Sequence, residues 1–257
     1  MIFDLHNDIY SATNQPISDF ISSVENLYGC IGVDWTSRKN GLISFEQKIN
    51  AEKIYYAIED LHFYTKKEQD VILKLNPLYC SLTWNDENAL AGGAFSDGDL
   101  TKIGKRVIDF LNDNDICIDL AHLNKRSFYS VVERSRKVIV SHTGVYELKN
   151  HRRNIDLLQA KLITQKQGLI GLTPVTFFMK GETVRDFAET IDFLVDKIGE
   201  SQVAIGTDFN GSTDFPNGLT SYFDFNKVRY YLENLGYKST AIDDIFFKNA
   251  MRYFDIK

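Results

Sequence analysis

The sequence is short of cysteine, of basic charge and of long apolar runs, and each shortage excludes a class of protein. Its 257 residues contain only three cysteines, an odd and widely spaced set that is not typical of a disulfide framework or a thiolate metal site. The formal net charge of −6 leaves no basic surplus to neutralise nucleic acid phosphates. No run approaches the ~20 apolar residues that span a bilayer, and polar residues at Asp4, His6 and Asp8 interrupt any signal-peptide core. We therefore expect a cytoplasmic protein with neither a nucleic-acid nor a membrane partner.

The composition is that of an ordinary globular protein, with 44% hydrophobic and 25% charged residues. There is no internal repeat, no low-complexity stretch and no linker rich in Pro, Gly or Ser. We therefore expect a single domain over residues 1–257.

Apolar runs of strand length alternate with longer segments of helical period. The predicted strands are Ile2–His6, Leu42–Phe45, Ile54–Glu59, Leu78–Trp84, Ile116–His122, Val138–His142, Gly168–Pro174 and Val203–Asp208. The predicted helices are Leu100–Asn112, Lys125–Ser135, Asp156–Gln167, Arg185–Ile198 and Phe225–Leu235, with Thr183 as a candidate N-cap for the fourth. This alternation predicts an α/β protein with a closed (β/α)₈ TIM-type barrel. Because the stretch Tyr10–Lys53 is irregular, we expect the barrel to be abbreviated or distorted near its second strand–helix unit.

Three of the five histidines stand at the ends of predicted strands, where parallel α/β folds build active sites. His6 and Asp8 are two residues apart, so in an extended strand both side chains reach the same side, and imidazole and carboxylate both suit zinc. His122 and His142 end consecutive strands and would lie side by side at the barrel mouth. The alternative is a set of ordinary polar strand ends, but together the segments suggest a metal-dependent hydrolase.

Carboxylates also stand at or near strand ends. Glu59 could bridge two ions, although Asp60 beside it leaves that assignment open. Asp208 could ligate a metal or move a proton, or it could cap a helix. Asp119 lies inside an apolar run, where a carboxylate must be hydrogen-bonded or paired, so it could support a ligand histidine.

Other polar and aromatic residues have both a functional and a structural interpretation. Arg153 and Asn154 follow His142, and a guanidinium there could bind a carboxylate or simply be surface charge. Trp84 ends the fourth predicted strand, as core packing or as the wall of a pocket. His62 and His151 have no strand-end context, and we interpret both as structural or solvated.

Taken in order, these segments resemble the membrane dipeptidase (renal dipeptidase, peptidase M19) family of the amidohydrolase superfamily. The matching segments are Asp4-Leu5-His6-Asn7-Asp8, Ile58-Glu59-Asp60, Ile118-Asp119-Leu120-Ala121-His122, Ser141-His142, Arg153-Asn154, Gly206-Thr207-Asp208-Phe209-Asn210-Gly211 and Pro216-Asn217-Gly218-Leu219.

The resemblance implies a (β/α)₈ barrel that binds two zinc ions. It implies that His6 and Asp8 bind one ion, that His122 and His142 bind the other, and that Glu59 bridges both. It further implies that Asp208 handles protons and that Arg153, within the family's Arg-Asn motif with Asn154, holds the substrate carboxylate.

The chain departs from the family pattern at four places. Trp84 replaces a histidine that contacts the substrate carbonyl in the family, so it would alter the substrate wall rather than the metal site. The segment before Glu59 is shorter than in typical members, which puts part of the barrel wall in question. Asp60-Leu61 replaces two glycines, and Asn210 replaces a second acid.

The predicted activity is that of a zinc-dependent dipeptidase that hydrolyses the amide bond of small dipeptides through a hydroxide bridging the two ions. Another binuclear-metal amide or lactam hydrolase, acting on N-acyl amino acids or cyclic amides, is the alternative enzyme. A metal-binding barrel without catalysis is the non-enzyme alternative. A homodimer is one possible assembly.

Overall fold

Eight parallel strands close into a barrel in chain order in the computed structural model, which describes residues 1–12, 24–36 and 53–257. The strands are β1 (Ile2–Asn7), β2 (Leu27–Trp35), β3 (Ile54–Glu59), β4 (Tyr79–Ser81), β5 (Cys117–Asp119), β6 (Val138–Thr143), β7 (Leu169–Leu172) and β8 (Val203–Ile205). The predicted (β/α)₈ barrel is therefore confirmed.

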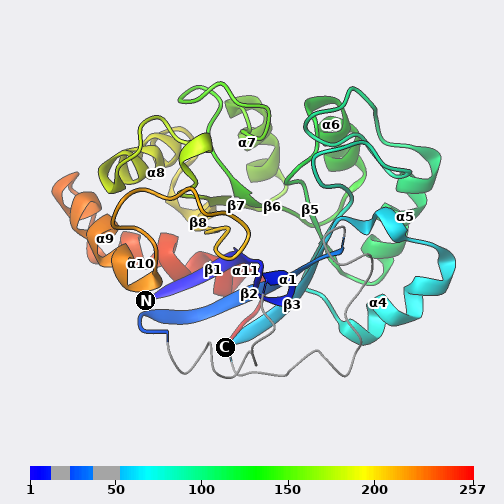
Figure 1. Ribbon diagram of the computed structural model, residues 1–257, viewed down its shortest axis with the longest axis horizontal. Coiled ribbons are helices and arrows are strands. Elements are labelled where there is room, and N and C mark those ends of the chain that lie inside the picture. The colour runs from blue at the N-terminus through cyan, green and yellow to red at the C-terminus, as the bar shows by residue number, and fades with distance from the viewer. Residues whose placement is uncertain (13–23, 37–52) are drawn as a thin grey trace.

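Helices follow the strands around the outside of the barrel, from α4 to α9 in Figure 1. The helices are α1 (Ile9–Ala12), α4 (Gln69–Leu75), α5 (Lys102–Asp113), α6 (Lys125–Arg134), α7 (Leu157–Gln165), α8 (Val184–Ile198), α9 (Phe225–Asn234), α10 (Ser239–Asp243) and α11 (Asn249–Tyr253), with a π-helical turn over Asp244–Lys248. All five predicted helices are present, with small differences at their ends. Thr183 caps α8, because its side chain accepts a hydrogen bond from the Asp186 backbone N–H.

The second strand differs from the sequence prediction. Leu42–Phe45 lies outside the described residues, and the second place in the barrel belongs to β2, which pairs with β1 and β3. The expectation of an abbreviated barrel is therefore wrong for the strands. The sequence did not indicate β2 as a strand, because Gly29 and Gly32 weaken its apolar pattern. Gly32 is needed there, since a Cβ atom would lie 2.5 Å from the ring of Tyr10.

Three predicted strands end three residues earlier than expected, at Ser81, Asp119 and Ile205. After β5 the chain turns because the Asp119 carboxylate accepts a hydrogen bond from the Ala121 backbone N–H at 3.0 Å. His122 and Asp208 then adopt left-handed backbone conformations, with φ of 67° and 63°, an uncommon state that recurs at functional sites. Both residues therefore lie on loops just beyond the carboxyl ends of the strands.

Every strand contributes to one apolar cluster, and only the barrel interior can bring side chains from all eight together. Its members are Phe3, Leu5, Ile31, Val33, Ala57, Tyr79, Cys117, Ile139, Leu169, Ala204 and, from α11, Ala250. Met251 and Tyr253 of α11, and Phe254 and Ile256 beyond it, pack against the same cluster. The C-terminal segment therefore closes the amino end of the barrel and leaves the carboxyl end for a site. The larger second cluster packs the helices onto the strands.

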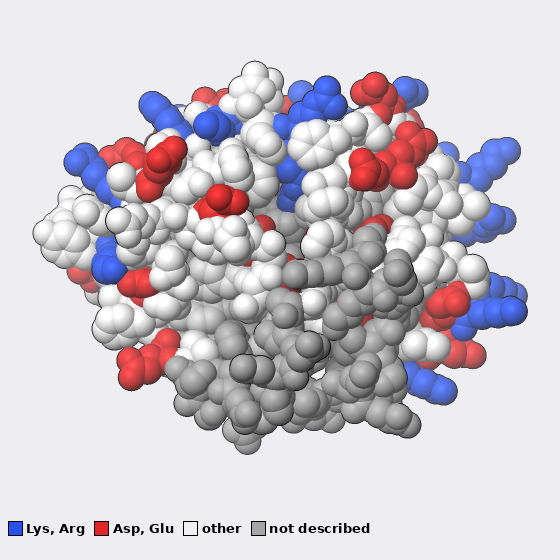
Figure 2. Space-filling model, viewed as in Figure 1, with Lys and Arg blue, Asp and Glu red and all other residues white. Residues whose placement is uncertain are grey.

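The surface carries charges of both signs, interspersed around the face shown in Figure 2. Some are paired across neighbouring helices, as in the contact of Arg134 on α6 with Asp109 on α5 at 2.5 Å. In the described part of the chain, no helix combines the length and the apolar character needed to cross a membrane.

Candidate metal centre and substrate cavity

Histidines and carboxylates from five strands converge at the carboxyl end of the barrel. His6 and Asp8 come from β1 and its end, Glu59 ends β3, His122 follows β5, His142 lies on β6 and Asp208 follows β8. They form three overlapping groups, each with its candidate ligand atoms within 4.8 Å of one another. The structure thus brings together all the residues that the sequence predicted for metal binding and proton transfer.

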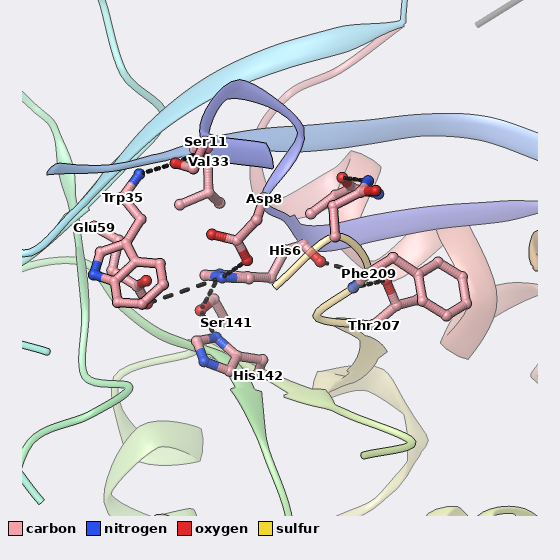
Figure 3. Close-up of polar contacts among 12 residues, drawn as sticks. His6, Asp8, Ser11, Val33, Trp35, Glu59, Ser141, His142, Thr207 and Phe209 are labelled. Carbon is pink, nitrogen blue, oxygen red and sulfur yellow. Dashed lines mark hydrogen bonds and ion pairs between the residues drawn. The ribbon is translucent and has the colours of Figure 1, made fainter. Parts of the chain in front are cut away.

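Glu59 lies between two pairs of residues. On one side, His6 Nε2 is 3.4 Å from Asp8 Oδ2 and 3.9 Å from Glu59 Oε1. On the other side, His122 Nε2 is 3.1 Å from the same Glu59 oxygen and 3.0 Å from His142 Nε2. This spacing suits a carboxylate shared by two cations. Figure 3 shows His6 between Asp8 and Ser141, with His142 below.

One serine orients two of the histidines. The Ser141 hydroxyl donates to Asp119 Oδ2 at 2.6 Å, so its oxygen is left to accept hydrogen bonds. Nδ1 of His142 lies 2.8 Å from it and Nδ1 of His6 lies 3.1 Å from it. His6 has a second acceptor in Tyr79 Oη, which lies 3.0 Å away and itself donates to the Leu5 carbonyl. Asp119 therefore supports the site through Ser141 rather than by contact with a histidine.

His122 is oriented separately by Asn85, whose Oδ1 lies 2.9 Å from His122 Nδ1. An amide oxygen only accepts hydrogen bonds, so Nδ1 of this histidine carries the proton. All three histidines therefore have Nδ1–H engaged and Nε2 directed toward the common centre, as ligand imidazoles do.

The charges at the centre perturb the histidines in opposite directions. Burial by itself would lower the pKa of His6, but the hydrogen bond with Asp8 and the charge of Glu59 outweigh it and raise this pKa to about 10. Burial, followed by the positive charges of Arg153 and His6, holds the pKa values of His122 and His142 well below the ordinary range.

Burial is also the largest influence on the pKa values of two carboxyl groups at the centre. Burial raises the pKa of Glu59 well above its usual value. Burial and then the charge of Asp8 raise the pKa of Asp208 to about 7. A bound cation would stabilise the ionised form of each of these acids.

The residues fit a pair of zinc-type cations. Asp8 Oδ1 is buried and has no hydrogen-bond partner among the described residues, a costly state that a cation would relieve. Imidazole nitrogens and carboxylate oxygens, without thiolate, are a usual ligand set for catalytic zinc.

The structure also distinguishes Glu59 from its neighbour. Asp60 accepts hydrogen bonds from the His62 backbone N–H at 3.2 Å and from Asn88 Nδ2 at 3.0 Å. Its side chain therefore holds the following turn, and Glu59 is the acid that faces the histidines.

Arg153 is 5% exposed and lies beside the histidines. Its Nη2 donates to His142 Nε2 at 2.7 Å, and its guanidinium lies 5.5 Å from the ring centre of Phe178. Its Nε has no hydrogen-bond partner among the described residues. A buried guanidinium with a free donor favours a carboxylate ligand.

Asn154 uses its amide differently from the direct substrate contact suggested by the Arg-Asn motif. Its Oδ1 accepts from the Gly144 backbone N–H at 3.0 Å, and its Nδ2 donates to the carbonyls of Lys149 and Phe178 at 2.8 and 2.9 Å. These bonds pin the loop that carries Arg153, so the geometry favours a positioning role for Asn154.

A cavity of about 280 Å³ opens above the centre. Trp84 lines it, as the aromatic-wall interpretation predicts. The lining also includes four aromatic residues that the sequence did not indicate, Trp35, Phe95, Phe177 and Phe178. His151, predicted to be structural or solvated, lines the cavity as well. Trp35 ends the strand that was not predicted. His151 had only its closeness to Arg153 in sequence as a signal.

Comparison with known proteins identifies the relatives of this chain. The model of the family described as membrane dipeptidase (peptidase family M19) matches residues 51–256. A dipeptidase of Aspergillus oryzae, aclJ, is 26% identical over 184 residues, which are 67% of this chain and 42% of the relative. The chain spans about half the length of the curated relatives that it matches, 59% and 42% for two of them.

Solved structures agree on the fold. An amidohydrolase from Pseudomonas aeruginosa superposes with a TM-score of 0.84 at 19% identity, covering 99% of this chain and 95% of that one. A metallopeptidase from Rhodobacter sphaeroides, solved with a phosphinate mimic of the dipeptide L-Ala-D-Ala, superposes with a TM-score of 0.82 at 16% identity, covering 99% and 98% of the two chains.

Proposed function

The chain belongs to the membrane dipeptidase family, peptidase family M19, and on this premise we propose that it is a zinc-dependent hydrolase of small dipeptides. The observation that carries the proposal is the convergence of three histidine Nε2 atoms and three carboxylates beside a buried arginine. Family membership and the dipeptidase relative support the same substrate class.

We assign the metal ligands by their grouping. His6 and Asp8 would hold one zinc ion, His122 and His142 would hold the other, and Glu59 would contribute to both. When bound, zinc would lower the pKa of a water molecule to about 7 and polarise the carbonyl of the scissile amide.

Asp208 is the proton carrier in this proposal. Its carboxylate accepts a proton from the attacking water as the C–O bond forms, and it returns the proton to the leaving nitrogen as the C–N bond breaks. Its pKa, raised to about 7 by burial and by Asp8, suits an acid–base group near neutral pH.

Arg153 binds the free carboxylate of the substrate through its Nε–H, which has no partner among the described residues, and through Nη2, which a metal ion on His142 Nε2 would release from that nitrogen. Asn154 holds the Arg153 loop, and Trp84 borders the bound substrate. A carboxylate fixed beside the metal centre places the neighbouring amide bond within reach, which favours dipeptides over long peptides.

A second candidate activity rests on Trp84. An aromatic side chain where the family has a polar histidine favours apolar acyl groups, as in N-acyl amino acids or cyclic amides. This activity would use the same metal site and the same proton carrier.

A substrate screen tests the proposal. Purified protein, loaded with zinc, is assayed against L,L- and L,D-dipeptides, N-acyl amino acids and cyclic amides, and its metal content is measured in parallel. We expect about two zinc ions per chain and the highest kcat/KM on dipeptides. Hydrolysis only of the other amides would support the second candidate, and two bound ions without any hydrolysis would indicate an inactive metal-binding barrel. A content of one ion or none would contradict the two-zinc site.

The cytoplasm is our proposed compartment, because all three cysteines are buried and unpaired, as in proteins of reducing compartments. A homodimer stays a prediction for solution measurements.

A further inference from the structure

The walls of the cavity differ sharply from its floor. The floor carries the histidines, the carboxylates and Arg153. Above them the lining includes five aromatic side chains, Trp35, Trp84, Phe95, Phe177 and Phe178. Substrate sites commonly pair a few polar groups that fix orientation with an apolar wall that binds the rest of the ligand.

The two tryptophans of the chain meet in this wall. The ring centres of Trp35 and Trp84 lie 4.6 Å apart with an angle of 34° between the planes. Trp35 pairs in register with Glu59 across β2 and β3, and the Trp84 ring centre lies 5.8 Å from that of His122. The tryptophan pair therefore stands beside the metal centre, and both rings are only partly buried.

A second group of rings borders Arg153. His151 lies between Phe178 and Phe95, with ring-centre distances of 5.0 and 6.2 Å. Phe95 is 50% exposed and Phe177 is 59% exposed. When a ligand covers large apolar side chains at the mouth of a cavity, their surface is removed from water and the complex is stabilised.

A dipeptide made of small residues would leave this wall largely uncovered. An aromatic or bulky apolar side chain would pack against it and remove both surfaces from water.

We propose that the Trp35–Trp84 pair is a specificity wall that selects substrates with an aromatic or bulky apolar side chain. The inference rests on the proposed function and narrows its substrate class. It predicts that the preference for phenylalanine dipeptides over Ala-Ala depends on Trp84.

Kinetics with matched substrates and variants test the wall. The zinc-loaded enzyme and its Trp84→Ala, Trp84→His and Trp84→Phe variants are assayed on Phe-Ala, Ala-Phe and Ala-Ala, with zinc content measured for each. Tyr230→Ala, which removes a 60% exposed ring on α9, is the control for loss of an aromatic elsewhere.

We expect wild type to prefer one or both phenylalanine dipeptides over Ala-Ala by about tenfold or more in kcat/KM. Trp84→Ala and Trp84→His should reduce that preference to about threefold or less, while Trp84→Phe and Tyr230→Ala keep it. The inference is overturned by equal rates on all three dipeptides in wild type, or by an unchanged preference in Trp84→Ala.

A fluorescence titration separates this inference from the proposed function. Both tryptophans line the cavity, so tryptophan emission reports on binding there without hydrolysis. We expect L-phenylalanine to change the emission of the zinc-loaded protein at a concentration about tenfold or more below that for L-alanine. If dipeptides are hydrolysed but neither measurement shows the preference, the wall is wrong and the proposed function stands. If no dipeptide is cleaved but L-phenylalanine binds preferentially, the proposed activity fails and the aromatic site stands.

Discussion

The two ends of the barrel differ in whether their buried polar groups have hydrogen-bond partners. At the amino end, α11 covers an apolar interior, and Tyr253 Oη donates to the Val138 carbonyl at 3.0 Å. At the carboxyl end, Asp8 Oδ1 and Arg153 Nε are buried without hydrogen-bond partners among the described residues. The difference indicates that the amino end is built for stability and the carboxyl end for ligands, as in other barrels of this class.

The largest effect is expected when a proposed metal ligand is removed from the carboxyl end. His142→Ala should lose the zinc held with His122 and lower kcat/KM by on the order of 10³-fold, because that cation polarises the reacting groups. Metal analysis and dipeptide kinetics measure both effects, and urea unfolding of the metal-free protein checks that the fold survives. Two retained zinc ions with near-normal kinetics would remove His142 from the site.

Removal of the proton carrier should separate rate from metal binding. Asp208→Asn should keep both zinc ions and lower kcat by roughly 10²–10⁴-fold, since amide side chains do not transfer protons in this way. In wild type, kcat/KM should fall as the pH drops below the pKa of Asp208, because protonation at low pH disables the base. That midpoint should lie at or below about 7, since bound cations favour the ionised form. Full turnover by Asp208→Asn would contradict the assignment.

The hydrogen bonds that orient His6 and His142 can be tested separately. Ser141→Ala removes a hydrogen-bond acceptor from both His6 and His142, but His6 keeps Tyr79. Zinc affinity should fall by about 10–100-fold. The loss should be larger for the ion held by His122 and His142 than for the ion held by His6 and Asp8. Tyr79→Phe is the matched control and should weaken only the His6/Asp8 ion. Calorimetric titration of metal-free protein resolves the two ions, and equal losses in both variants would refute this division.

The carboxylate contact is tested by substrate choice. Arg153→Ala should raise KM by about tenfold or more for dipeptides with a free carboxylate, with a smaller effect on kcat. C-terminally amidated dipeptides, which lack that charge, are the control and should show little change. An unchanged KM for free dipeptides would place the carboxylate elsewhere.

The smallest effect is expected at the amino end. Tyr253→Phe removes the hydrogen bond to Val138 and should lower the free energy of unfolding by about 1 kcal/mol, while kcat and KM stay unchanged. Urea denaturation and dipeptide kinetics measure the two quantities. A loss of activity would show that the two ends are coupled.

Much of the architecture was predictable from local pattern. Apolar runs alternating with helical periods predicted the barrel, and the Thr183 cap of α8 was read directly from its residue type. The second strand was not predictable in this way, because Gly29 and Gly32 break its pattern. These two positions need glycine because the rings of Phe3 and Tyr10, from other parts of the chain, leave little room for a Cβ atom.

The site was predictable in part for a similar reason. His6, His122 and His142 stand at or near the ends of apolar runs, so their shared location follows from the rule for parallel strands. The selection of Glu59 over Asp60 was not settled by these runs, since Glu59 ends the strand and Asp60 follows it directly.

The barrel class and the residue types that a metal centre needs follow from the sequence, because periodicity and strand-end position are local properties. The support of those residues and their surroundings follow from how the chain folds in three dimensions. Ser141 orients two histidines, and Trp35 meets Trp84, through contacts between strands distant in sequence. Such contacts depend on how the barrel closes, so no local pattern contains them.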